Sequence, residues 1–140
     1  MTDTAPHLRL TCAGAQKILS AAMAKAAAMK IPQCISVVDD GGNLLAFARM
    51  DGARVLSIDS SNAKARTAAS SRLPTGQIDD TLGIKLAVAA QGRFLNLPGG
   101  LPIVVDGHVI GGIGVGSGTG EQDTEVAKAG IAALAGAKAW

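Results

Sequence analysis

Apolar residues recur every three or four positions between residues 11 and 29, and this spacing predicts an amphipathic helix. Thr11 belongs to the residue types that cap a helix N-terminus, and Pro32 lies just beyond the expected end. The apolar face of this predicted helix carries Ile18, Leu19, Ala22, Met23 and Ala26.

Two pairs of β-rich runs follow, and each pair is joined by a glycine-bearing turn. The first pair covers residues 34–38 and 44–50. The second pair covers residues 101–105 and 108–115, around the dipeptide Asp106-Gly107. A short glycine turn between two such runs is a strong hairpin signal, so both pairs predict β-hairpins.

Three further helices are predicted, over residues 56–70, 81–90 and 123–137, with Asp123 as the N-cap of the last. Hairpins join neighbouring strands directly and therefore predict an antiparallel sheet. The expected fold is α+β: an antiparallel sheet built from two hairpins and flanked by alanine-rich helices. A chain of this length is expected to form a single domain over residues 1–140.

The composition points to subunit association. Hydrophobic residues make up 48% of the chain, but aromatic residues only 2%, and the apolar volume comes mainly from alanine, valine, isoleucine and leucine. Small side chains each bury little apolar area, so a monomer of this kind is expected to be only marginally stable. We therefore expect a homo-oligomer; the alternative is a tightly packed, thermostable monomer.

Charge and sequence pattern argue against several classes of partner. The net charge is +2, and the basic residues are scattered, so no nucleic-acid partner is expected. No apolar stretch is long enough to predict a membrane span. The N-terminal residues lack the basic region of a secretory signal, so a cytoplasmic location is expected, with Cys12 and Cys34 as reduced thiols.

A glycine-rich segment, residues 112–120, joins the last predicted strand to the last helix. It does not match GxGxxG, because Ser117 stands where the third glycine is required, and it lacks the P-loop pattern. Glu121 and Asp123 place carboxylates where a phosphate would bind. We expect this segment, with Gly116, Ser117 and Gly118, to form one wall of a pocket for a different ligand.

Other polar residues are candidates for ligand contacts. Arg49 and Asp51 are two apart and would share a face of a strand, as a structural pair or as a site that orients a ligand carboxylate. Lys64 and Thr67 share a helix face, where Lys64 is either a ligand anchor, a desolvated base or a lysine that extends to solvent.

The two histidines, His7 and His108, do not form a recognisable metal motif. No HxH or HExxH spacing is present, so no zinc site is expected. A haem iron needs only one or two axial ligands, and two scattered histidines are compatible with it.

Several segments together resemble the GlcG/HbpS-like family. They are residues 38–53, 62–69, 74–75, 98–103, 109–118 and 122–123. The family includes haem-binding proteins and the C-terminal domain of PduO-type corrinoid adenosyltransferases. The resemblance implies an antiparallel sheet flanked by helices, a homo-oligomer from dimer to octamer, and haem binding in some members.

Three functions are therefore considered. The first is an oligomeric cytoplasmic protein that binds haem or a related tetrapyrrole, with contacts from Arg49, Thr67, Thr75, Gly116, Ser117 and Gly118. The second is a cofactor-free enzyme of isomerase, lyase or hydrolase type that acts on a small oxygenated or carboxylated catabolite. Arg49 would then hold a carboxylate, and Asp51, Lys64 or Asp123 would move a proton. The third is a non-catalytic accessory subunit of a catabolic pathway.

Overall fold

The computed structural model describes residues 2–140, and the order of elements along them agrees with the predicted one. The elements are α1 (Cys12–Ala28), β1 (Cys34–Asp39), β2 (Leu44–Arg49), α2 (Ser57–Ser71), α3 (Asp80–Ala89), β3 (Gly100–Val105), β4 (His108–Gly116) and α4 (Gly120–Ala132). Thr11 caps α1 as predicted, because its hydroxyl accepts a hydrogen bond from the backbone N–H of Gly14.

The four strands form one antiparallel sheet in the order β2-β1-β4-β3. The two predicted hairpins are β1–β2 and β3–β4, and they meet where Cys34 lies opposite Gly116 and Asp39 opposite Gly111. The α+β class is thereby confirmed. Since β1 and β4 are central, nearly all their residues are buried, whereas the edge strand β2 is largely accessible.

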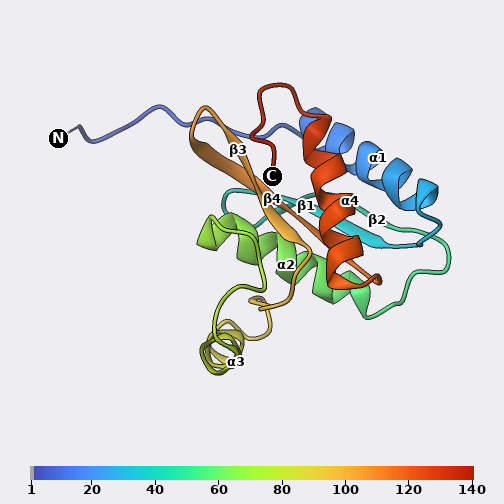
Figure 1. The fold of residues 1–140 in the computed structure, drawn as a ribbon. Helices are drawn as coiled ribbons and strands as arrows, with labels where there is room; N and C mark the ends of the chain where they lie inside the picture. Colours follow the sequence, from blue (N-terminus) through green and yellow to red (C-terminus); the bar gives the residue numbers. More distant parts are fainter. Residues whose placement is uncertain (1) are drawn as a thin grey trace.

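Helices cover both faces of the sheet (Figure 1). α2 packs on one face, while α1 and α4 pack together on the other. α3 stands apart from the sheet and buries only Gly83. The largest side chains of the core lie between the sheet and the α1–α4 pair: Ile18, Leu19, Ile35, Val37, Ile103, Ile113, Val115, Val126 and Ile131.

Glycines in β4 bring α2 unusually close to the sheet. A Cβ atom at Gly112 would overlap the carbonyl oxygen of Ala65, and one at Gly114 would overlap that of Ser61. A Cβ atom at Gly116 would instead meet side-chain atoms of α2, the Ser60 hydroxyl first and then Ser57. This stretch of the glycine-rich segment therefore accommodates the backbone of α2.

The last helix differs from its prediction at both ends. α4 begins at Gly120 and ends at Ala132, whereas residues 123–137 were expected. Asp123 is not its N-cap: Thr119 is, since its hydroxyl accepts from the N–H of Gln122 while the Gln122 side chain accepts from the N–H of Thr119. The carboxylate of Asp123 bonds elsewhere, inside the protein.

None of the helices formed by residues 2–140 has the length and hydrophobicity that a membrane crossing requires. Both cysteines are free thiols: Cys12 is exposed and Cys34 is buried. Burial raises the pKa of the Cys34 thiol, an effect that nearby Arg49 partly opposes. A raised pKa lowers the fraction of reactive thiolate at Cys34.

Candidate functional site

Lys64 and Asp123 form a buried ion pair between α2 and α4. The Lys64 Nζ atom lies 2.9 Å from Asp123 Oδ2 and donates a second hydrogen bond of 2.8 Å to the carbonyl of Val115. The other carboxylate oxygen of Asp123 accepts from Gln33 Nε2 at 2.7 Å and from the N–H of Gly118 at 2.9 Å. The two charged groups thus tie both helices to the ends of the central strands.

This pair is withdrawn from solvent, because the side chains of Lys64 and Asp123 are 6% and 3% exposed. Burial raises the pKa of Asp123, and the opposing effects come from Lys64, the Gly118 N–H and the Gln33 amide. Lys64 therefore does not extend to the surface, one of the alternatives open from the sequence. The roles in proton transfer of Lys64, Asp123 and Asp51 stay predictions.

Arg49 and Asp51 are not brought together as expected. Arg49 is the last residue of β2, and Asp51 lies in the turn that follows the strand, so the two do not share a strand face. Both side chains are exposed, and no ion pair joins them within residues 2–140. Lys64 and Asp123 are the two predicted polar residues that do meet.

Ser117 and Gly118, predicted ligand contacts, bond to neighbouring segments of the chain. The Ser117 hydroxyl accepts from the N–H of Arg54 at 3.0 Å and lies 2.6 Å from the hydroxyl of Ser57. A Cβ atom at Gly118 would overlap the side-chain amide of Gln33. These bonds fix the loop against the start of α2.

Two threonines hold the segment 95–100 against α2. The Thr67 hydroxyl donates to the carbonyl of Ala63 at 2.7 Å and accepts from the N–H of Leu95 at 2.9 Å. The Thr75 hydroxyl donates to the carbonyl of Leu97 and accepts from the N–H of Gly100. Of the predicted ligand contacts, Thr67 also lines a large cavity beside α2.

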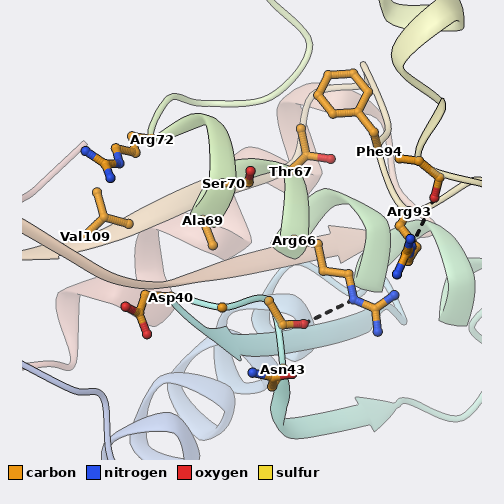
Figure 2. A pocket seen from close by; sticks show the side chains of 13 residues that line it. Asp40, Asn43, Arg66, Thr67, Ala69, Ser70, Arg72, Arg93, Phe94 and Val109 are labelled. Atoms are coloured by element: carbon orange, nitrogen blue, oxygen red, sulfur yellow. Dashed lines mark hydrogen bonds between the residues drawn. The ribbon is translucent and has the colours of Figure 1, made fainter.

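That cavity, which we call the arginine pocket, has a volume of about 580 Å³. Figure 2 shows it between the β1–β2 turn, α2 and the segment that follows α3. The volume lies within the range of about 300–1,000 Å³ that is usual for small-molecule sites. Its lining residues are Asp40, Gly41, Gly42, Asn43, Arg66, Thr67, Ala69, Ser70, Arg72, Ala90, Arg93, Phe94 and Val109.

The charge of the arginine pocket favours an anion. Its lining contains three arginines, Arg66, Arg72 and Arg93, and a single carboxylate, that of Asp40. Within residues 2–140, no carboxylate oxygen lies within 4.0 Å of any of the three guanidinium groups. Phe94 adds an aromatic ring to this cationic lining.

A histidine contacts one residue of the pocket lining, Asp40. The Nε2 atom of His7 lies 3.3 Å from Asp40 Oδ2, and its side chain is 60% exposed. The residues before α1 therefore reach the β1–β2 turn. A carboxylate next to one ring nitrogen orients an imidazole for ligation through the other.

Sequence reasoning missed most of the arginine pocket. Arg66, two residues after Lys64 on α2, lines the pocket but was not among the predicted ligand contacts. Arg72, Arg93 and Phe94 carry no motif. The sequence signal that could have indicated an anion site is the presence of three arginines within residues 66–93. Their spacing alone does not show that they line one cavity.

Comparison with known proteins identifies the family of this chain. A family model described as haem degrading protein HbpS-like matches residues 10–132. An uncharacterized 15.0 kDa protein from the dhaT-dhaS intergenic region of Citrobacter freundii is 42% identical over 124 residues, which cover 85% of this chain and 87% of that protein.

Two solved structures share the fold closely. Klebsiella pneumoniae protein ORFY superposes with a TM-score of 0.88 at 34% identity, over 96% of this chain and 97% of that one. PduOC in complex with haem superposes with a TM-score of 0.85 at 28% identity, over 94% and 98%. The resemblance seen in the sequence is thereby confirmed. By sequence and by fold, the chain belongs to the HbpS-like family.

Proposed function

We propose that this protein binds haem or a related tetrapyrrole in the arginine pocket. The observation that carries the proposal is the presence of three arginines without a carboxylate partner within residues 2–140, Arg66, Arg72 and Arg93, in the lining of a cavity that also includes Phe94. Family membership supports it, as does the haem complex of the structural neighbour PduOC.

The residues present fit such a group. The carboxylates of a tetrapyrrole require cations, and guanidinium groups bind them through paired N–H donors. Phe94 offers apolar contact to the macrocycle. His7, held at Asp40 through one nitrogen, is the candidate axial ligand. Bound haem would supply redox-active iron, while the chain would hold its acid groups and exclude water from one face.

Titration with haemin tests this proposal. We expect a saturable shift of the Soret band at one haemin per chain, and a different Soret position in a His7→Ala variant, because the axial ligand has changed. His108→Ala is the matched control, since His108 is also exposed but forms no ion pair with Asp40 within residues 2–140. Both spectra should be recorded on protein whose circular dichroism matches wild type.

A titration without saturation would contradict haem binding. Identical spectra for His7→Ala and wild type would remove His7 as the ligand. Stabilisation by small carboxylates without any Soret shift would instead favour the second candidate, an enzyme acting on a carboxylated catabolite.

We also propose that the chain assembles into a cytoplasmic homo-oligomer, as its small-residue core favours. The exposed apolar surface of α3 supports this assembly. Ile84 and Val88 are 67% and 74% exposed, and Leu82 and Leu86 are exposed as well. A helix that is apolar on several sides and stands apart from the sheet (Figure 1) is suited to burial against another surface.

Adding charge to α3 should dissociate the oligomer. For the double variant Ile84→Glu, Val88→Glu, we expect sedimentation at the monomer mass, because glutamates cannot be buried in an apolar contact without a large cost. Leu56→Glu is the control, since Leu56 is 79% exposed at the N-cap of α2, outside α3, and should tolerate the charge. A wild-type protein that sediments as a monomer would disprove the assembly.

A further inference from the structure

Arg66 and Arg93 each make one side-chain hydrogen bond within residues 2–140, through Nε, and none through their terminal nitrogens. The Nε atom of Arg66 donates to the carbonyl of Gly42 at 3.2 Å, and that of Arg93 donates to the carbonyl of Ala90 at 3.0 Å. Figure 2 shows both bonds and the two guanidinium groups on the same side of the pocket. The anchoring bonds restrict how each guanidinium turns, and its terminal nitrogens remain available as paired donors.

The two arginines also border a second cavity. This cavity has a volume of about 520 Å³, and its lining includes Arg66 and Arg93 together with Asp59, Asn62 and Gln91. Arg66 and Arg93 thus stand at the boundary between two hollows. A ligand group placed between the two arginines can therefore be contacted by residues of either cavity.

Two other lining residues of the second cavity, Asp59 and Asn62, are unsuited to binding an anion. The lining contains the carboxylate of Asp59, and the Oδ1 atom of Asn62 is buried without a hydrogen-bond donor among residues 2–140. Both groups present oxygen lone pairs, which repel an acid group and favour a donor. Negative charge on a ligand is therefore restricted to the arginines.

We infer that Arg66 and Arg93 form a clamp that selects ligands with two acid groups on one molecule. Each guanidinium binds one carboxylate through its terminal nitrogens, while the body of the ligand lies in the arginine pocket beside Phe94. This inference rests on the proposed binding function and specifies how the ligand's acid groups are recognised. A ligand with one acid group leaves one guanidinium without its partner.

Esterified haemin tests the clamp directly. Haemin dimethyl ester keeps the iron and macrocycle but loses both negative charges. Wild-type protein should bind haemin at least about tenfold more tightly than the ester, because hydrogen bonds to charged groups contribute about 1.5–3 kcal/mol. In the double variant Arg66→Gln, Arg93→Gln, this preference should disappear, whereas Arg54→Gln, at an exposed arginine outside both cavities, should retain it.

A second probe does not depend on haem. Linear dicarboxylates from succinate to pimelate, compared with monocarboxylates of equal length, should raise the melting temperature of wild type but not of the double glutamine variant.

Equal affinity for haemin and its ester would overturn the clamp while leaving haem binding in place. Failure of haemin to bind, with dicarboxylates still selected through Arg66 and Arg93, would overturn the proposed function and leave the clamp standing. Absence of any dicarboxylate preference would overturn the clamp as well.

Discussion

Replacing Lys64 with methionine is expected to lower the free energy of unfolding by about 3–5 kcal/mol, the usual cost of removing one partner of a buried ion pair. Methionine keeps much of the volume but leaves the Asp123 carboxylate buried with hydrogen bonds from Gln33 and Gly118 only. Urea unfolding followed by circular dichroism measures the change.

A double-mutant cycle separates the ion pair from the other bonds. Asp123→Asn retains an oxygen that accepts from Gln33 and Gly118 but leaves Lys64 unpaired. The double variant Lys64→Met, Asp123→Asn should lose less than the sum of the single losses, because it removes both charges. His7→Ala, which breaks the exposed contact to Asp40, is the control and should cost less than about 1 kcal/mol. Additive losses would show that Lys64 and Asp123 do not act as a pair.

The pH dependence gives this prediction a sign. Burial raises the pKa of Asp123 above its value in the unfolded chain, so this group's contribution to stability falls as the pH rises through the interval between the two values. Removing Lys64 removes the strongest opposing effect, and the pKa should rise further. The stability deficit of Lys64→Met relative to wild type should therefore be larger at neutral pH than at mildly acidic pH.

Gly114→Ala is expected to destabilise the protein by at least about 3 kcal/mol, since overpacking against atoms that cannot move is among the costly substitutions. The added methyl group would overlap the carbonyl oxygen of Ser61 and the amide nitrogen of Ala65, both in the backbone of α2. To relieve the overlap, α2 would have to move away from the sheet. Thermal and urea unfolding of the variant measure the cost.

The matched control is Gly107→Ala in the β3–β4 turn. No atom lies within 4 Å of a Cβ at Gly107, but its φ of +75° disfavours alanine. Left-handed backbone costs a non-glycine residue about 1–2 kcal/mol, so this variant reports conformational strain without overlap. If Gly114→Ala were no more destabilising than Gly107→Ala, the close packing of α2 on β4 would not be what requires glycine at residue 114.

The order and type of the elements were predictable because their signals are local. Helical spacing and the Thr11 cap define α1, and the Asp106-Gly107 turn defines the β3–β4 hairpin. The start of α4 was misplaced for a reason that is also instructive. Aspartate is a residue type that often caps helices, but the carboxylate of Asp123 accepts a hydrogen bond from Lys64, which lies 59 residues earlier in the chain.

The arginine pocket could not be predicted in the same way. Asn43, Arg66, Arg93 and Val109 line one cavity although they come from four separate segments. No short-range pattern links them, because a cavity is formed by backbone segments that the sheet order and the packing of α2 bring together. The arginines also lack the fixed spacing of a motif, since only their final positions matter for charge.

The sequence by itself determined the helices, the two hairpins and the α+β class, because periodicity, caps and turns act over a few residues. It also carried the resemblance to the HbpS-like family. Only the tertiary structure decided which polar residues meet: Lys64 with Asp123 inside the fold, and Arg66 with Arg93 at a cavity. Charge pairing and cavity formation depend on distances between remote segments, and those distances exist only once the sheet and its helices have packed.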